Sequence, residues 1–201
     1  MTKAIDYYLS LDCAFAYLGS QELERIAQRH RATVRVKPVH LPTVFERTGG
    51  LPVKQRSAER QAYRFIEMRR WRDQRGLRLI PEPPFFPVDD APAADIVLAA
   101  DAVGRKPLRI AHAILRALWA EEQNIADRPS LLEIAQRNGE DALGIVAKAR
   151  DPAIREQLTA NTEEAIRIGM FDSPWYVHRG TPFHGQDRLD FLDRALAADP
   201  A

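Results

Sequence analysis

The chain has 201 residues, of which 45% are hydrophobic and 28% charged, a composition typical of a globular protein able to bury a sizeable core. Its 29 lysine and arginine residues almost balance 28 aspartate and glutamate residues, so the net charge of +1 favours no polyanionic partner such as nucleic acid. One cysteine excludes an intramolecular disulfide framework, and no apolar run suits a signal peptide or membrane span, so we expect a cytoplasmic protein.

The first forty residues predict a strand, a helix and a second strand. Residues 4–9 are rich in Ile, Tyr and Leu and are short enough for a buried strand. Asp12 then stands where it can cap a helix whose apolar stripe extends from Phe15 to Ala27. Residues 33–39, "TVRVKPV", alternate like a strand. This order implies a parallel strand pair with a right-handed crossover.

The segment 43–150 is predicted to consist of helices and loops. An arginine-rich helix is expected over residues 58–75, followed by the proline-punctuated loop "PEPPFFPVDDAP". Further helical periods cover residues 93–103, 108–123 and 131–137. The last of these is expected to open with a capping box formed by Ser130 and Glu133 and to stop at Gly139.

The last fifty residues predict a helix, a hairpin and a closing helix. Asp151 at the cap and Pro152 in the first turn indicate the start of a long helix. "WYVHRGTPF" predicts two strands around Arg179-Gly180. "QDRLDFLDRAL" predicts an amphipathic helix capped by Asp187.

This order of elements predicts an α/β protein interrupted by an all-helical insertion. Residues 1–42 and 151–201 would form one discontinuous α/β domain, and residues 43–150 the insertion. The chain contains no G-x-G-x-x-G, P-loop or G-x-S-x-G motif, so dinucleotide binding, NTP binding and α/β-hydrolase chemistry are not indicated.

Cys13 is the leading candidate for a reactive side chain, because it lies where the first strand gives way to the first helix. Unpaired amides and the helix dipole stabilise an anionic sulfur at such a position, whereas the adjacent Asp12 opposes it. Ala16 stands where a C-x-x-C motif would place its second cysteine, which excludes a dithiol cycle within one chain. From this pattern alone, burial as a small core residue is the more common fate of a cysteine.

Two dipeptides near the end could bind a ligand. A cis bond between Ser173 and Pro174 would present the backbone of Ser173 to an extended ligand, and a trans bond that only starts a strand is the alternative. Asp187 and Arg188, at a helix start, could hold both ends of a zwitterion, and a plain helix cap beside a solvated arginine is the alternative.

Two other groups of residues suggest weaker sites. His178 and His184 could approach each other across the hairpin, but strand-edge histidines are more common than a metal pair, so we expect no metal. In the helix at 58–75, arginines alternate with aromatic residues, and Glu59, Glu67 and Asp73 lie among them. This mixture favours a solvated face or a wall facing an anionic substrate over a nucleic-acid surface.

Taken together, three stretches resemble the 2-hydroxychromene-2-carboxylate isomerase family. They are "YYLSLDCAFAYL", "VKPV", and "GMFDSPWYV" followed by "FHGQDRLDFL". The family is related to kappa-class glutathione transferases and, more distantly, to DsbA-type oxidoreductases, and the resemblance covers essentially the whole chain. It implies a thioredoxin-like fold with a helical insertion, bound glutathione and a homodimer.

The resemblance also implies roles for individual residues. Cys13 takes the place of a catalytic serine that hydrogen-bonds the glutathione thiolate, and Ala14 that of the proline after it. Ser173, before Pro174, would pair with the glutathione backbone. Lys37 matches a lysine near the site that would suit a substrate carboxylate.

The closing helix contributes the other implied contacts. Asp187 and Arg188 would hold the γ-glutamyl end of glutathione, with Gln186 adjacent. Gly50 stands where relatives often have an asparagine that touches glutathione, so that side chain is lost here.

We therefore expect a glutathione-dependent cis–trans isomerase of a hydroxychromene carboxylate or a related aromatic catabolite. Cys13 would stabilise the glutathione thiolate, and Tyr63, Phe65 or Trp71 would hold the substrate ring. Two alternatives stay open. One is a glutathione transferase or monothiol reductase in which Cys13 attacks sulfur, and the other is a non-enzymatic module that binds an acidic partner through the arginine-rich helix.

Overall fold

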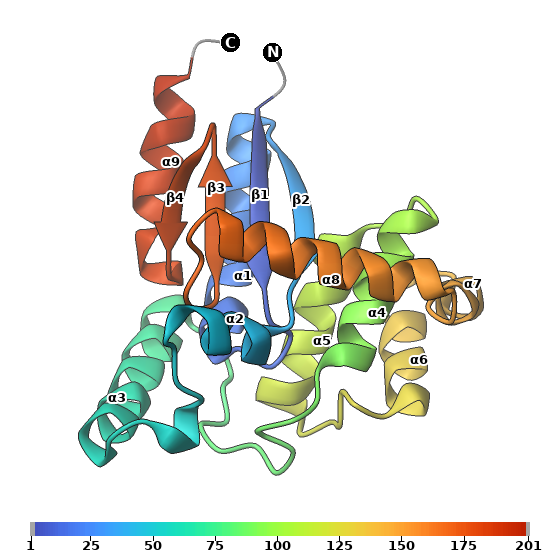
Figure 1. Ribbon diagram of the computed structural model, residues 1–201, viewed down its shortest axis with the longest axis horizontal. Coiled ribbons are helices and arrows are strands. Elements are labelled where there is room, and N and C mark those ends of the chain that lie inside the picture. The colour runs from blue at the N-terminus through green and yellow to red at the C-terminus, as the bar shows by residue number, and fades with distance from the viewer. Residues whose placement is uncertain (1–2, 200–201) are drawn as a thin grey trace.

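Over the residues that the computed structural model describes, 3–199, a four-stranded mixed sheet forms the centre of the protein (Figure 1). Its strands lie in the order β2-β1-β3-β4, with β1 (Ala4–Leu9) parallel to β2 (Thr33–Pro38). The hairpin of β3 (Trp175–His178) and β4 (Thr181–His184) continues the sheet in antiparallel pairing. All four predicted strands are confirmed.

The alternating side chains of β1 divide the interior into two apolar clusters. Tyr7 and Leu9 face the larger cluster, which includes residues of α1 (Ala14–His30) and α9 (Leu189–Ala198). Tyr8, between them, belongs to a smaller cluster on the other face with residues of α2 (Leu41–Thr48) and α8 (Pro152–Arg167). Because successive strand residues point to opposite faces of the sheet, β1 contributes side chains to both clusters.

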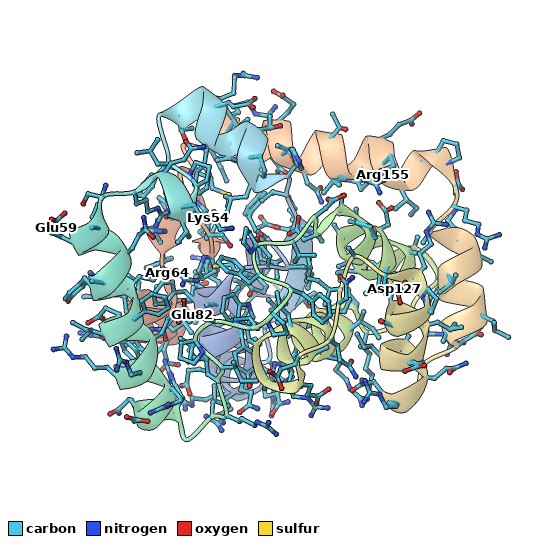
Figure 2. The ribbon with its side chains drawn as sticks, turned by 90° about the horizontal axis from the view of Figure 1, so that it is seen from below. Lys54, Glu59, Arg64, Glu82, Asp127 and Arg155 are labelled. Atoms are coloured by element: carbon cyan, nitrogen blue, oxygen red, sulfur yellow. The ribbon has the colours of Figure 1, made fainter. Side chains whose placement is uncertain are left out.

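Five helices make up most of the segment between α2 and α8. They are α3 (Ala58–Arg75), α4 (Ala91–Ala102), α5 (Pro107–Glu121), α6 (Arg128–Arg137) and α7 (Ala142–Lys148). Viewed from below, α3 with Glu59 lies on one side of the molecule and α6, which follows Asp127, on the other (Figure 2). The helix α7 was not among the elements predicted from the sequence.

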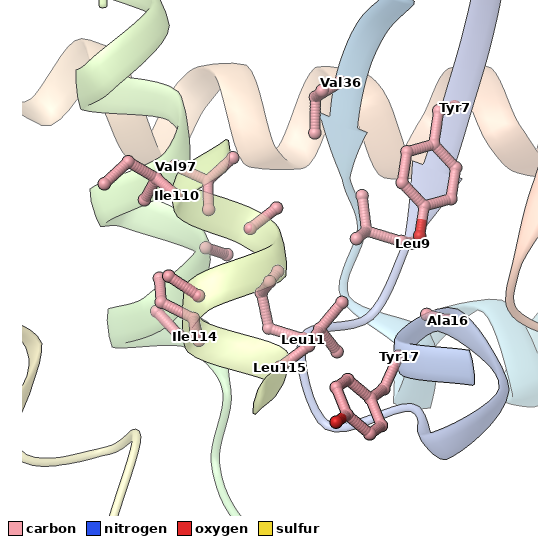
Figure 3. Packing of buried hydrophobic residues seen from close by; sticks show 14 of the residues in the cluster. Tyr7, Leu9, Leu11, Ala16, Tyr17, Val36, Val97, Ile110, Ile114 and Leu115 are labelled. Atoms are coloured by element: carbon pink, nitrogen blue, oxygen red, sulfur yellow. The ribbon is translucent and has the colours of Figure 1, made fainter. Parts of the chain in front are cut away.

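The core of these helices is continuous with that of the sheet. Figure 3 shows Leu11 beside Leu115 of α5, and Leu9 and Ile114 belong to the same cluster of buried residues. The α/β fold class is confirmed. The division into residues 1–42 with 151–201 and an insertion at 43–150 stays a prediction.

Three predicted helix caps differ from those in the structure. Cys13, in an extended conformation, occupies the N-cap of α1, while Asp12 contacts Ser10 instead. Asp127 caps α6 by accepting hydrogen bonds from the amide and the hydroxyl of Ser130, so the helix begins earlier than the predicted capping box.

The third difference is at the closing helix, where a short 3-10 turn, Gln186–Arg188, precedes α9 and leaves Arg188 at the N-cap in place of Asp187. The predicted cap of α8 is confirmed, because Asp151 accepts a hydrogen bond from the amide of Ala153 at 3.0 Å. Among the described residues, no helix has both the length and the apolar character needed to cross a membrane.

Candidate active site

A cavity of about 580 Å³ lies at the end of the sheet where β1 leads into α1. Its walls come from the start of α1, from α2 and the turn after it, from α3, from the loop before α4, and from the loops on both sides of the β3–β4 hairpin. This volume is within the range of small-molecule sites. Segments far apart in the sequence therefore meet around one ligand-sized space.

Cys13 lines this cavity as a neutral thiol. Its Sγ donates a hydrogen bond to the carbonyl oxygen of Ser173 at 3.2 Å. Burial and the nearby charge of Asp172 raise the pKa of the Cys13 thiol to about 12, which outweighs the opposing backbone hydrogen bond from Ala16. Cys13 is therefore a hydrogen-bond donor at neutral pH, although it stands at a helix N-terminus.

Ser173 lies directly against Cys13 and is buried. The bond between Ser173 and Pro174 is cis. The Ser173 hydroxyl accepts a hydrogen bond from the amide of Ser10 at 3.1 Å, and the Ser173 amide donates to the Asp172 carboxylate at 2.8 Å. The backbone groups of Ser173 thus already have partners within the protein, and a ligand that pairs with them would share or replace those bonds.

A pair of carboxyl groups beside Cys13 shares one hydroxyl. The Ser10 Oγ lies 2.5 Å from a carboxyl oxygen of Asp12 and 2.9 Å from one of Asp90, whose carboxyl also accepts the amide of Leu11. The Ser10 hydroxyl has a single proton and can donate to only one of the two carboxyl groups. Both contacts are therefore hydrogen bonds only if the other carboxyl group is protonated and donates to Ser10.

The surroundings of these carboxyl groups favour the protonated form. Burial, reinforced by the charge of Asp90, raises the pKa of Asp12 to about 7, and burial also raises that of Asp90. Because Asp90 accepts the Leu11 amide, the negative charge is better placed on Asp90 and the proton on Asp12. The sequence pattern predicts only a helix cap at Asp12 and gives no sign of Asp90, whose contact with Ser10 spans 80 residues.

The turn before α9 forms another part of the cavity wall. Gly185, Gln186 and Asp187 line the cavity, and Gln186 is buried. Gly185 has a φ of +88°, and a Cβ there would lie 2.4 Å from the Asp187 carboxylate, so only glycine fits this close approach. Arg188 forms an ion pair with Asp187 at 3.0 Å but is not among the residues that line the cavity.

Comparison with known proteins identifies the family of this fold. A family model described as a DSBA-like thioredoxin domain matches residues 4–197. The chain belongs to the DSBA-like thioredoxin family. The thioredoxin-like fold predicted from the sequence is therefore confirmed for this DsbA-like domain.

Relatives and solved structures agree with the predicted resemblance. The 2-hydroxychromene-2-carboxylate isomerase of Sphingobium xenophagum is 25% identical, over 98% of this chain and 99% of its own length. A solved 2-hydroxychromene-2-carboxylate isomerase is 22% identical with a TM-score of 0.79, over 96% of this chain and 94% of that one. The cytosolic disulfide reductase DsbM from Pseudomonas aeruginosa with GSH is 21% identical with a TM-score of 0.67, over 96% and 99%.

Lys37 is not brought to the cavity of the DsbA-like domain. It lies on β2 with its ammonium 2.7 Å from the Glu164 carboxylate of α8 and 3.2 Å from the Tyr8 hydroxyl. Burial opposes its charge, but the hydrogen bonds to Glu164 and Tyr8 prevail and raise the pKa of Lys37. Lys37 is thus a member of an ion pair on the α8 side of the sheet and is not among the residues that line the cavity.

Gly50 is also absent from the lining of the cavity. A Cβ at Gly50 would lie 2.2 Å from the ring of Phe45, which itself lines the cavity. In this DsbA-like domain the ring of Phe45 therefore occupies space that a side chain at position 50 would need.

The aromatic wall is only partly the one predicted. Of the three aromatic residues expected to hold a substrate, Trp71 lines the cavity, Tyr63 is 56% exposed, and Phe65 packs against the core. Phe15 and Phe86 also line the cavity and were missed, because the sequence does not reveal which turns and loops face α1.

The two histidines of the hairpin are separated in the structure. His178 contacts the Ala4 carbonyl and the Asp199 carboxylate, each at 2.8 Å, while His184 lines the cavity. The strand register pairs His178 with Thr181 rather than with His184. Within residues 3–199 of the DsbA-like domain, no three His, Cys, Asp or Glu side chains gather as a group that could hold a metal ion.

Proposed function

We propose that this DsbA-like domain is a glutathione-dependent cis–trans isomerase that acts on 2-hydroxychromene-2-carboxylate or a related aromatic carboxylate. The observation that carries the proposal is the neutral thiol of Cys13, held at the start of α1 and open to a cavity that has a polar wall and an aromatic wall. The two isomerases to which the chain is similar over nearly its whole length support the reaction.

The polar wall of the cavity, formed by Gly185, Gln186 and Asp187, would suit glutathione. Asp187 offers a carboxylate to an ammonium group, Gln186 offers a buried amide beside it, and Gly185 leaves room that a side chain would fill. The similar fold of DsbM with GSH supports this choice of ligand. When bound, glutathione would supply the sulfur nucleophile, whose reversible addition to an enone turns a double bond into a rotatable single bond.

The residues of the chain would prepare the cavity for this chemistry. The Cys13 thiol would donate its hydrogen bond to an anionic sulfur, as a hydroxyl would at the same position. Asp12, with a pKa of about 7, would release or accept a proton at neutral pH within the same cavity. Trp71 and Phe86 would exclude water from the face of a flat substrate.

The two alternatives receive less support. A pKa of about 12 leaves on the order of one Cys13 in 10⁵ ionised at neutral pH, which weighs against a nucleophilic Cys13. In the arginine-rich helix α3, Arg70 pairs with Glu67 and Arg72 with Asp73, so part of its positive charge is already neutralised. Homodimerisation and a cytoplasmic location stay predictions, and sedimentation of the pure chain would test the first.

Replacement of Cys13 tests the proposed function. We expect isomerisation of 2-hydroxychromene-2-carboxylate, followed by absorbance, to require glutathione. Cys13→Ser should retain most of this activity, because a hydroxyl also donates a hydrogen bond, whereas Cys13→Ala should lose about ten- to a hundred-fold. No glutathione-dependent activity in the wild type would contradict the proposal. An inactive but folded Cys13→Ser variant would favour covalent thiol exchange.

A further inference from the structure

Arg64 of α3 is a cation in the wall of the cavity. It is partly buried, and within residues 3–199 its guanidinium makes neither an ion pair nor a hydrogen bond. Figure 2 shows Arg64 on the side of α3 that faces the body of the molecule and Glu59 on the opposite side. A partly desolvated charge of this kind gains stability from any anion that enters the cavity.

Aromatic rings hold this guanidinium in place. Its central carbon lies 5.1 Å from the ring centre of Phe86 and 5.5 Å from that of Trp119. Trp119 is fully buried and belongs to the core, whereas Phe86 lines the cavity, so Arg64 contacts one ring of each kind. A stacked guanidinium loses little freedom when it binds a carboxylate with its planar fork.

The acidic residues around the cavity already have other partners. Asp172 pairs with Arg56 at 3.2 Å, Asp187 with Arg188 at 3.0 Å, and Glu67 with Arg70 at 2.7 Å. The carboxyls of Asp12 and Asp90 are satisfied by Ser10, and Asp89 accepts the amide of Ala91. Lys54 also lines the cavity without an ion pair in the described chain, but its side chain is exposed and hydrated.

The position of Arg64 separates it from the polar wall. Arg75, eleven residues further along α3, contacts Gln186 at 3.4 Å. At a rise of 1.5 Å per residue, Arg64 is displaced from Arg75 by about 16 Å along the helix axis. Arg64 therefore belongs to the aromatic side of the cavity, beside Phe86.

We propose that Arg64 is a specificity-determining residue that binds the carboxylate of a flat aromatic substrate, whose ring lies against Phe86. The proposal rests on the proposed function for the placement of glutathione at the opposite, Asp187 side of the cavity. It gives to Arg64 the carboxylate contact that the family resemblance implies for Lys37. It also gives a role to a cation that, within residues 3–199, forms no ion pair and lies against the rings of Phe86 and Trp119.

A matched pair of ligands tests this assignment in the full-length chain. Chromone-2-carboxylate and the uncharged chromone-2-carboxamide share the same bicyclic ring, so calorimetric titration of each isolates the contribution of the carboxylate. We expect the wild type to bind the carboxylate roughly ten- to a hundred-fold more tightly. Arg64→Gln should remove this preference and leave carboxamide affinity within about two-fold. Arg60→Gln, an exposed arginine on the same helix, is the control and should retain the preference.

Three results would overturn the assignment. The first is a wild type that does not prefer the carboxylate over the carboxamide, and the second is a folded Arg64→Gln variant that still prefers it. The third result is an Arg64→Gln variant whose affinities for the two ligands fall by the same factor. If Arg64→Gln does not fold, the arginine Nε–Hε NMR signal of wild-type Arg64, assigned with Arg64→Lys, provides the readout. It should move with the carboxylate and not with the carboxamide, and an unchanged signal contradicts the proposal.

Titration with glutathione separates this proposal from the proposed function. Arg64→Gln should bind glutathione as the wild type does. If the variant loses glutathione affinity but keeps its carboxylate preference, Arg64 serves glutathione and the inference is wrong. If the wild type binds no glutathione yet shows an Arg64-dependent carboxylate preference, the proposed function fails while the assignment of Arg64 as a carboxylate-binding residue stands.

Discussion

Replacement of Asp12 by asparagine should make the protein more stable at neutral pH. The pKa of Asp12 is raised from 3.8 to about 7 in the fold, so the folded state retains a proton that the unfolded chain releases. Stability from this group is therefore fully present below pH 4 and is lost as the pH rises towards 7. At about 1.4 kcal/mol per pKa unit, the loss has a ceiling of about 4 kcal/mol.

The structure indicates that asparagine can replace the protonated acid. An amide at position 12 can donate a hydrogen bond to Ser10 as the carboxylic acid does, and Ser10 can then donate to Asp90. Because the cavity admits water to the partly exposed Asp12, we expect a gain of about 2 kcal/mol at pH 8, below that ceiling, and almost none at pH 4.

Urea unfolding at several pH values between 4 and 8.5 measures this effect. The control is Asp73→Asn, which removes the same charge from a side chain that is 66% exposed and should change stability little at any pH. An Asp12→Asn variant that is less stable than the wild type at pH 8 would contradict this prediction. A gain in stability that is the same at pH 4 as at pH 8 would also contradict it.

Two further predictions concern the walls around the site. Gly185→Ala should lower stability by about 1–3 kcal/mol and weaken glutathione binding, because φ is +88° and the new Cβ would meet the Asp187 carboxylate. Thermal unfolding measures the loss of stability, and titration with glutathione measures the loss of affinity. An unchanged melting temperature would contradict this prediction. Lys37→Gln should lower stability by about 1 kcal/mol through loss of the Glu164 and Tyr8 contacts, and should leave the KM for the aromatic carboxylate unchanged. A clear rise in that KM would instead place Lys37 near the substrate.

The fold could be predicted because its signals are local. The short apolar run at residues 4–9 predicts β1 with the bounds that the structure has. The turn at Arg179-Gly180 lies between β3 and β4, as the sequence predicts. Helix caps were less predictable. Asp127 and Ser130 both offer capping oxygens, and only the structure shows that Asp127 accepts from Ser130 and extends α6.

The proximity of two candidate residues could be expected from the sequence, because each adjoins a strand of the predicted sheet. Cys13 follows β1 and Ser173 precedes β3, its antiparallel neighbour, and the Cys13 Sγ lies 3.2 Å from the Ser173 carbonyl oxygen. The arginine-rich helix was expected as a solvated face or a wall facing an anionic substrate, but the sequence does not tell which of its arginines lies against Phe86. Asp90 could not be predicted, because its contact with Ser10 spans 80 residues. Lys37 shows the same limit, since one step along β2 turns a side chain from one face of the sheet to the other.

The shared core of the sheet and of helix α5 has a consequence for how the protein unfolds. Leu9 and Ile114 belong to one cluster, so separation of the helical segment from the sheet would expose apolar surface on both parts. The two parts should therefore melt together in a single cooperative transition. A shortened chain without the helical segment would lose the part of the cavity wall that α3 and the loop before α4 contribute, and would expose apolar surface prone to aggregation.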